Sequence, residues 1–349
     1  MSSVGIVIPC YMYGHFLEEC VGSVLDEQPG IDVRTVIIDN ASTDDSADVA
    51  RAIARRDPRV EVIVHETNMG HIASINEGLE ALADCDYLVI LAADDMLTPG
   101  SLGRAVSLLD ENPNVGFCYG HPLHFDHPGA KPTARTVATG HAVWPGHWWL
   151  ERRFREGHGC VSSPEVVMRT SVQRKVGGYD PALPHTCDIA MWMRMAAHAD
   201  VGYIRGADQA YFRRHGRNLS MTRFSSQLED IRARRAAFES VIATCGDLLP
   251  NGGKDLNTVV HRRLARSALR HAYRAYDRGR TAAVPVDELI QFAMETWPEY
   301  EQLPEYRSLR LRQSIGPKAM PYLQPLILSA VIDKGRNELW WRSWRRNGI

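Results

Sequence analysis

The first hundred residues alternate between short apolar segments and longer segments in which apolar residues recur at helical spacing. Apolar segments occupy 4–10, 34–40, 59–66 and 87–93, and helical patterns fill 15–30, 42–58 and 71–83. Apolar strands that alternate with helices form a parallel sheet with helices on its faces. The sequence therefore predicts an α/β fold with a mostly parallel central sheet flanked by helices.

Carboxylates stand at the ends of two of these strands. Asp39 closes the second apolar segment, and Asp94 and Asp95 directly follow the fourth. Ligands of open parallel sheets bind at the carboxyl ends of the strands, so we expect these three acids at one crevice. Two adjacent negative charges beside a buried strand require a positive partner, unless the pair only caps the helix that follows.

The usual phosphate-binding loops are absent. Neither GxxxxGK[ST] nor GxGxxG follows the first strand, which argues against a P-loop or a dinucleotide fold. Mg²⁺ or Mn²⁺ held by carboxylates can neutralise a diphosphate instead, because these ions prefer oxygen ligands. We therefore expect the Asp94–Asp95 pair to meet a metal ion that binds a diphosphate.

Composition excludes several classes of protein. A net charge of −2 gives no case for nucleic-acid binding, and seven cysteines without a CxxC pair suggest neither a disulfide framework nor a zinc site. The N-terminus lacks the basic and apolar regions of a signal peptide, and no uncharged apolar run reaches about 18 residues. A cytoplasmic protein is the expectation.

Beyond residue 222 the pattern becomes helical. Apolar residues recur at helical spacing in 224–249, 255–276 and 285–297, which predicts a helical C-terminal region over 223–349 after a catalytic domain over 1–222. These helices are candidates for packing on the catalytic domain, for closing over the acceptor or for homodimer formation. Trp and Arg alternate in the tail 337–349, and we favour its docking on this or a partner chain over peripheral membrane contact.

Several blocks resemble family 2 glycosyltransferases, which have the GT-A fold, and they follow one another in family order. In the family's metal-binding motif, an acid stands two residues before the position of Asp94. This chain has Ala92 there, which leaves open whether Asp94 or Asp95 holds the metal. The similar blocks are VGIVIPCYMYGHFLEECVGSVLDEQ, VIIDNASTDDS, NMGHIASINEGLEAL, LAADDMLTPGSL, GGYDPALPHTCDIAMWMRMA and YFRRHGRNLS, within about residues 3–222.

The resemblance implies a nucleotide-sugar site. Asp39 would contact the base, and an acceptor-only carboxylate suits the N3–H of uracil or thymine better than the N3 acceptor of cytosine. The alternative for Asp39 is a helix N-cap. The other residues that the resemblance implies for the nucleotide sugar are Pro9, Tyr11, Asn68, Asn76 and Asp94.

The resemblance also implies catalytic and metal-binding residues. Asp188 would be the general base that deprotonates the acceptor, because Cys187 replaces the first acid of the family's pair. Asp95, with Asp94, would hold Mn²⁺ or Mg²⁺, and His215 would complete the metal shell or contact the diphosphate. The alternatives are a first-turn acid for Asp188 and a surface histidine for His215. Arg213, Arg214 and Arg217 are candidates for neutralising phosphate.

Aromatic residues gather between the two halves of this site. Trp144, Trp148 and Trp149, with His147 and His158, suit sugar rings, although such aromatics commonly pack in cores.

The predicted function is inverting transfer of a sugar from a UDP-sugar, or a dTDP-sugar, to an acceptor hydroxyl or amine with a divalent metal. The transferred sugar would be a hexose, an N-acetylhexosamine or a deoxysugar, and the acceptor a small metabolite, a glycan or a lipid-linked sugar. Two alternatives remain: a nucleotidyltransferase that forms nucleotide sugars, and a non-catalytic carbohydrate- or nucleotide-binding protein on the same scaffold.

Overall fold

The computed structural model describes residues 2–218, 226–323, 335, 338–344 and 346–349. The chain forms two compact units, the first comprising 1–150, 160–218 and 346–348, and the second 151–159, 219–345 and 349. The predicted domain boundary at residue 222 lies outside the described residues.

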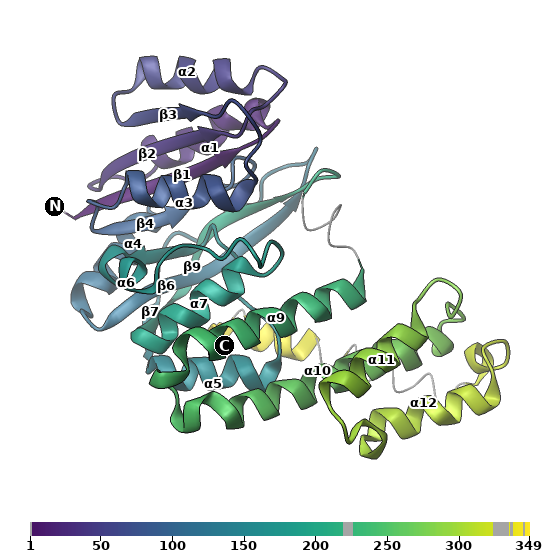
Figure 1. Ribbon diagram of the computed structural model, residues 1–349. Helices are drawn as coiled ribbons and strands as arrows, with labels where there is room; N and C mark the ends of the chain where they lie inside the picture. The colour runs from purple at the N-terminus through teal and green to yellow at the C-terminus, as the bar shows by residue number, and fades with distance from the viewer. Residues whose placement is uncertain (1, 219–225, 324–334, 336–337, 345) are drawn as a thin grey trace. The chain divides into compact units, whose positions relative to one another are not determined.

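A nine-stranded sheet forms the centre of the first unit, in the order β3-β2-β1-β4-β8-β6-β9-β5, with β7 also paired to β9 (Figure 1). The first four strands of this order are parallel, as predicted. Beyond them the sheet is mixed, because β8 runs antiparallel to both β4 and β6. The strands are β1 (Ser3–Cys10), β2 (Asp32–Asp39), β3 (Val60–Val64), β4 (Tyr87–Ile90), β5 (Met96–Leu97), β6 (Val115–Asp126), β7 (Gly140–Trp144), β8 (Val166–Arg169) and β9 (Asp200–Arg214).

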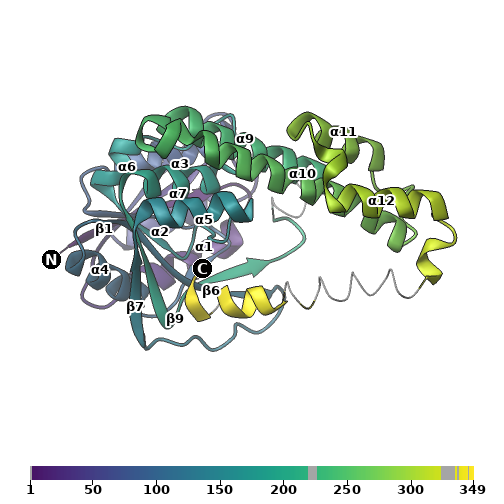
Figure 2. The same ribbon diagram turned by 90° about the horizontal axis from the view of Figure 1, so that it is seen from below.

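Helices cover both faces of this sheet (Figures 1 and 2). Alternate residues of β1 point to opposite faces, so Ile6 and Ile8 join one core with α1 (Gly14–Leu25), α2 (Ser46–Arg56) and α4 (Ser101–Glu111). Val7 faces α3 (His71–Ala81) instead, and a Cβ on Gly78 of that helix would lie 2.2 Å from Val7 Cγ1. The absence of a side chain at Gly78 thus lets α3 approach the sheet closely.

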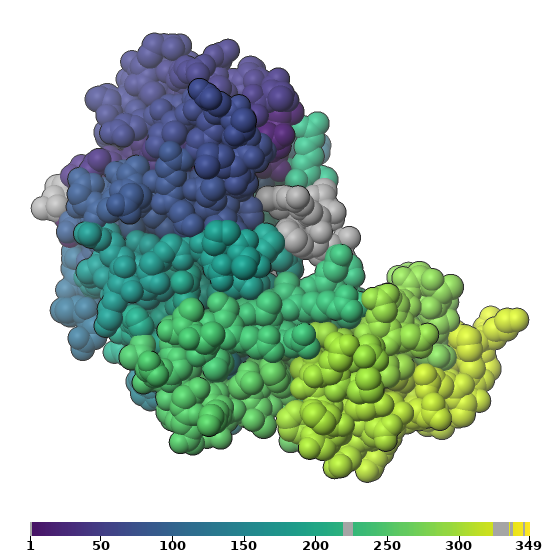
Figure 3. All heavy atoms as spheres, in the orientation of Figure 1, coloured from purple at the N-terminus to yellow at the C-terminus, as the bar shows by residue number. Residues whose placement is uncertain are grey.

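Two further helices cover the β6–β8 part of the sheet. They are α6 (Thr170–Val176), which directly follows β8, and α7 (Cys187–His198). Trp192 of α7 packs on Phe117 of β6, with ring centroids 5.6 Å apart. In the space-filling view, residues of β1 to α3, purple to blue, pack as one continuous body (Figure 3). The predicted α/β fold is confirmed.

The second unit is helical, as predicted. Phe238, Leu264, Leu269, Phe292 and Leu309 form part of its buried apolar interior. Its described helices are α9 (Gln227–Cys245), α10 (Lys254–Asp277), α11 (Val286–Thr296) and α12 (Pro304–Ile315), together with the end of α5 (Gly146–Glu156). Homodimer formation through these helices stays a prediction.

Part of the tail belongs to the first unit. Residues 346–348 lie there, and the Tyr119 hydroxyl donates a hydrogen bond to the carbonyl of Gly348. This agrees with docking of the tail on its own chain. All seven cysteines are free. Within the described ranges, no helix has the length and apolar character to cross a membrane.

Candidate active site

The carboxyl ends of β1, β2 and β4 meet at one edge of the sheet. Cys10 pairs with Asp39 in register, and the amide of Leu91 donates to the carbonyl of Val7. Asp39 and the Asp94–Asp95 pair therefore follow the two strands that flank β1, at the same edge of the sheet, as the sequence predicts.

Asp39 is buried, and among the described residues only one of its carboxylate oxygens has a donor. Oδ2 accepts a hydrogen bond from the amide of Ser42 at 3.1 Å. Oδ1 is buried and has no partner within the described part of the chain. The alternative role as a helix N-cap is wrong, because α2 begins at Ser46 with Asp45 as its N-cap. Asp39 thus has one acceptor oxygen that no described residue satisfies.

The loops after β1 and β2 are joined by side chains. The amide of Met12 donates to Ser42 Oγ at 2.9 Å, and the amide of Gly14 donates to Ser46 Oγ at 2.7 Å. A Cβ on Gly14 would lie 2.7 Å from Ser46 Cα, so the first residues of α1 and α2 lie in close backbone contact. Met12 and Ala41 have φ values of 62° and 59°, which cost free energy in residues other than glycine and are common at functional sites.

The other residues predicted for the nucleotide sugar have distinct environments. Pro9 lies inside β1. The backbone nitrogen of Pro9 faces the side of β4, and β4 pairs with β1 only as far as Val7. The missing N–H group of Pro9 therefore removes no hydrogen bond between strands. Tyr11 follows the strand and is 46% exposed. Asn68 Oδ1 accepts from Asn40 Nδ2 at 3.0 Å and shapes its loop. Their contacts with a nucleotide sugar stay predictions.

Asn76 joins α3 to the segment that precedes α7. Its Oδ1 accepts from the amide of Tyr179 at 2.7 Å, and its Nδ2 donates to the carbonyl of Tyr179 at 2.9 Å. This pair of bonds gives Asn76 a structural role, and its contact with the nucleotide sugar stays a prediction.

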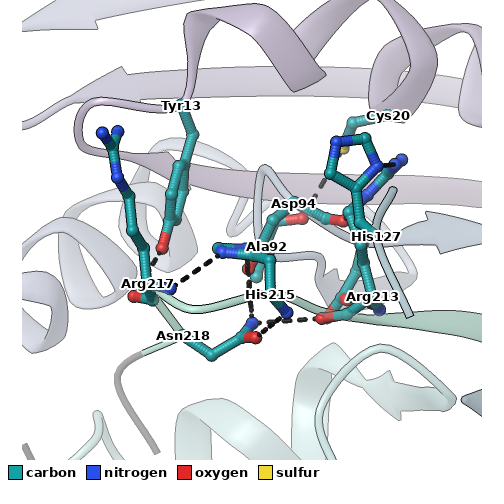
Figure 4. A network of polar contacts seen from close by, with 10 residues as sticks. Tyr13, Cys20, Ala92, Asp94, His127, Arg213, His215, Arg217 and Asn218 are labelled. Atoms are coloured by element: carbon teal, nitrogen blue, oxygen red, sulfur yellow. Dashed lines mark hydrogen bonds and ion pairs between the residues drawn. The ribbon is translucent and has the colours of Figure 1, made fainter. Parts of the chain in front are cut away.

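The acidic pair after β4 is buried and partly satisfied by the end of β9. Asp94 Oδ2 accepts from His215 Nε2 at 2.9 Å and from Asn218 Nδ2 at 3.0 Å (Figure 4). Asp95 Oδ1 accepts from the amide of Arg213 at 2.9 Å. Burial, and next the charge of Asp94, raise the pKa of Asp95 well above its usual range. A further cation would therefore stabilise the pair.

Arg213, a candidate for neutralising phosphate in the sequence, forms its contacts within the protein. Its guanidinium is buried, donates to Glu19 Oε2 at 2.6 Å and to the carbonyl of Asp94 at 2.8 Å, and lies over the ring of Phe16. It is therefore committed to the protein and is not exposed to bind phosphate. Arg214 is paired with Asp126, and Arg217 is exposed.

His215 is a hydrogen-bond donor in this arrangement. Its Nδ1 accepts from the amide of Arg217 at 3.2 Å, so the proton is on Nε2, which donates to Asp94. Both ring nitrogens are thus used within the protein, and His215 acts on Asp94. Its predicted direct contact with a metal stays a prediction and requires a different ring arrangement. Asn218 also contacts Asp94, although the sequence analysis did not single it out.

Two carboxylate oxygens of the acidic pair remain for a metal. Among the residues that the structure describes, none donates to Asp94 Oδ1 or Asp95 Oδ2. The same residues contain no group of three or more His, Cys, Asp or Glu side chains arranged around a metal position. Mg²⁺ commonly binds through one or two carboxylates together with substrate phosphates, so the pair fits a site that a diphosphate completes.

Asp188 lies in the first turn of α7 and is half-buried. Its Oδ1 accepts from the amide of Ile189 at 2.7 Å. Burial raises the pKa of Asp188 from 3.8 to about 6. The carboxylate is thus largely ionised at neutral pH yet more basic than an ordinary Asp, which suits a general base.

Glu165, before β8, is a further acid that the sequence analysis missed. It is 2% exposed, and its Oε1 accepts from the amide of Ser162 at 2.6 Å. Burial, and next the charge of Asp188, raise the pKa of Glu165 from 4.5 to about 8. The charge of Glu165 in turn raises the pKa of Asp95, so Glu165 interacts electrostatically with two of the predicted site acids. An acid directly before the apolar VVM segment was the available signal.

The aromatic stretch divides between core and surface. Trp149 is buried, packs edge-on against Phe117 and donates from Nε1 to the Tyr119 hydroxyl. Trp148 is 40% exposed and stacks on Trp144. Trp149 is therefore a core residue, as one of the two interpretations of these aromatics expected, and Trp148 keeps an exposed aromatic face.

Comparison with known proteins identifies the domain. Residues 5–171 match the family described as "Glycosyl transferase family 2". These residues form a family 2 glycosyltransferase domain. The predicted family and the predicted enzyme class, a glycosyltransferase, are thus confirmed.

Relatives of the transferase domain support this assignment. An uncharacterised glycosyltransferase, EpsJ of Bacillus subtilis (strain 168), is 30% identical over 109 residues, which are 31% of this chain and 31% of EpsJ. The chain therefore spans about a third of that relative's length.

Two solved structures share the fold. TarS 1-349 of S. aureus, in complex with UDP-GlcNAc, matches with a TM-score of 0.61 and 16% identity over 92% of this chain and 90% of TarS. The mannosyltransferase PcManGT of Pyrobaculum calidifontis, in complex with GDP-Man and Mn²⁺, matches with a TM-score of 0.51 and 15% identity over 94% and 86% of the two chains. These likenesses confirm the predicted GT-A fold.

Proposed function

We propose that the protein transfers a sugar from a UDP-sugar, with a dTDP-sugar as the next choice, to an acceptor hydroxyl or amine with inversion at the anomeric carbon. The observation that carries the proposal is the grouping of Asp39 and the Asp94–Asp95 pair at one edge of the sheet of a family 2 glycosyltransferase domain. The structure of TarS contains UDP-GlcNAc, which supports a nucleotide-sugar donor here.

Asp39 would recognise the nucleobase. A buried acceptor oxygen without a donor is costly, and the N3–H of uracil supplies the missing hydrogen bond. Cytosine presents an acceptor at N3 and would leave Oδ1 facing another lone pair. Guanine carries an N1–H donor, so GDP belongs in any comparison of nucleotides.

Asp94 and Asp95 would hold Mn²⁺ or Mg²⁺ through their two remaining oxygens, with His215 and Asn218 fixing the orientation of Asp94. When bound, such an ion neutralises the diphosphate and favours its departure. The structure of PcManGT contains Mn²⁺, which supports the choice of a divalent ion. The protein contributes the fixed geometry of the carboxylates.

Asp188 would remove the proton from the acceptor. Because its pKa lies near 6, the ionised carboxylate is present at neutral pH and accepts the proton as the acceptor oxygen or nitrogen attacks the anomeric carbon. Direct attack opposite the leaving diphosphate inverts the configuration. The backbone amide of Ile189 holds one carboxylate oxygen of Asp188, and the second oxygen is left for the acceptor proton.

The test is a thermal-shift series with UDP in Mn²⁺ and in EDTA. UDP should stabilise the wild-type protein much more in Mn²⁺, because a ligand that binds only the folded state raises stability by mass action. Asp95→Ala should lose most of that difference, whereas Asp84→Ala, which removes an exposed acid paired with Arg34, should keep it. An unchanged metal response in Asp95→Ala would exclude Asp95 as a ligand.

Release of UDP from a UDP-sugar separates the proposal from its alternatives. A transferase releases UDP from the UDP-sugar when an acceptor is present. A nucleotidyltransferase instead cleaves the UDP-sugar with added diphosphate to UTP and a sugar 1-phosphate, and a non-catalytic binding protein does neither.

A further inference from the structure

The helical second unit contains a cavity of its own. Its volume is about 440 Å³, which is within the usual range for small-molecule binding sites. The residues that line it all belong to the second unit and come from the start of α9, the end of α10 and the segment 280–289. Three separate segments of the chain therefore form the walls of one cavity.

The lining of this cavity carries positive charge. Arg274, Arg278 and Arg280 line it, and none of the described residues that line it is an Asp or a Glu. Arg278 and Arg280 are exposed, and neither side chain has a hydrogen bond or an ion pair with a described residue. Both guanidinium groups can therefore donate their N–H groups to a ligand that enters from solvent.

Two acids on the helices that form the cavity already have arginine partners. Asp230 of α9 accepts a hydrogen bond from Arg234 at 2.7 Å, and Asp277 of α10 accepts one from Arg312 at 2.7 Å. These carboxylates are therefore neutralised by arginines outside the lining and do not balance its charge.

Two further features of the lining favour an anion. Gln227 and Leu228 are the first residues of α9, and the N-terminal amides of a helix favour negative charge. Burial, and next the charge of Arg274, lower the pKa of His271 to about 4. His271 is thus neutral at neutral pH and brings one N–H donor to the lining.

The dipole of α10 explains only part of this arrangement. A cation in the last turn of a helix is favoured by the dipole, which accounts for Arg274. Arg278 is the C-cap of α10, and Arg280 lies beyond the helix, yet both line the same cavity. Arg274 and Arg278 are four residues apart, a spacing at which like charges destabilise a helix and at which a bound anion would remove that cost.

We propose that this cavity binds a phosphate group, with Arg274, Arg278 and Arg280 as its contacts. Arginine suits phosphate because its planar fork can form two parallel hydrogen bonds to the anion. Leu228, Val284 and Leu289 also line the cavity and give the uncharged remainder of a ligand an apolar surface. None of these residues belongs to the proposed nucleotide-sugar site, so the inference goes beyond the proposed function.

The test compares how inorganic phosphate changes the melting temperature of wild type and two double variants. Arg278→Gln with Arg280→Gln, the cavity pair, removes two charges from the lining. Arg307→Gln with Arg310→Gln, the control pair, removes two exposed charges from α12 in the same unit. Each protein is melted in EDTA with phosphate or with chloride at equal ionic strength. EDTA removes divalent ions from the proposed metal site, and the control pair measures the general effect of phosphate salts on stability.

Phosphate should raise the melting temperature of wild type and of the control pair above its value in chloride. The cavity pair should lose most of that gain, and its apparent affinity for phosphate should be weaker by at least about 10-fold, because hydrogen bonds to the charged ligand are lost. An equal gain in all three proteins would be the general salt effect alone and would overturn the inference.

Vesicles of phosphatidylglycerol distinguish a lipid headgroup from a soluble phosphate ligand. Sedimentation of wild type and the control pair with these vesicles, but not of the cavity pair, would assign the phosphate to a lipid. A phosphate effect on melting without vesicle binding would assign it to a soluble ligand. Absence of both effects in wild type would overturn the inference and leave the proposed function intact.

Circular dichroism checks that each variant is folded. If the cavity pair does not fold, Ala283→Glu places an acid in the lining, and Ala282→Glu places one at an exposed neighbour outside it. Ala283→Glu should then lose the phosphate gain that Ala282→Glu keeps, and an equal gain in these two variants would contradict the assignment of the cavity.

Discussion

The buried carboxyl group of Glu165 should make stability fall with rising pH. Below pH 4.5 the group is protonated in both the folded and the unfolded chain and has no effect. Between pH 4.5 and 8 only the unfolded chain releases the proton, so the free energy of unfolding declines as the pH rises. Above pH 8 the loss is complete.

The size of the loss follows from the shift in pKa. A rise from 4.5 to about 8 corresponds to about 5 kcal/mol in full, of which about 3 kcal/mol applies at pH 7. The side chain is only 2% exposed, so solvent screening reduces these figures little. Glu165→Gln cannot ionise and should therefore be the more stable protein at pH 8.5, with the advantage shrinking towards pH 5.

Urea unfolding followed by circular dichroism at pH 5, 7 and 8.5 measures this difference. Glu111→Gln, which removes an exposed charge in α4, reports the effect of losing a surface carboxylate alone. If wild type and Glu165→Gln keep a constant difference in free energy of unfolding across the three pH values, the carboxyl group is not held protonated by its surroundings and the reasoning fails.

Three further predictions concern single residues. Asp188→Asn should lower the transfer rate by roughly 10²–10⁴-fold with UDP-sugar affinity unchanged. The rate of transfer by the wild-type protein should also decline as the pH falls through about 6, where Asp188 becomes protonated. A rate that changes neither with Asp188→Asn nor with pH in this range would remove Asp188 from the mechanism. Asp39→Asn adds a hydrogen-bond donor and should narrow the preference for UDP over CDP, measured by calorimetry. Equal affinities of the wild-type protein for UDP and CDP would refute the assignment of Asp39 to the base. Asn76→Ala should lower the free energy of unfolding by about 2 kcal/mol in urea, because the amide and carbonyl of Tyr179 both lose their partner.

The sequence predicted the parts of the site that are local in the chain. Apolar strands followed by acids placed Asp39 and the Asp94–Asp95 pair at one edge, because parallel strands end at the same side of a sheet. The helical second unit followed from periodicity in the same way. These features depend on residues within a few positions of one another.

What the sequence left out depends on contacts between distant segments. Arg213 lies 119 residues from Asp94, whose carbonyl it contacts, and nothing in the run RRHGR shows that its guanidinium faces inward to Glu19 and Phe16. Glu165 was missed for a similar reason, since its burial is produced by packing and not by its neighbours in sequence. The mixed half of the sheet was also missed, because an antiparallel β8 between β4 and β6 has no local signature.

The joined loops after β1 and β2 have a consequence for the thermodynamics of ligand binding. Met12 and Gly14 donate to Ser42 and Ser46, so the two loops hold one another in place before any ligand arrives. Ordering a free loop on binding reduces conformational entropy and weakens affinity. Here that loss of entropy has already occurred during folding. A nucleotide that lies against these loops should therefore bind with a small entropic cost from the backbone, and cutting either link should appear mainly in the entropy of binding.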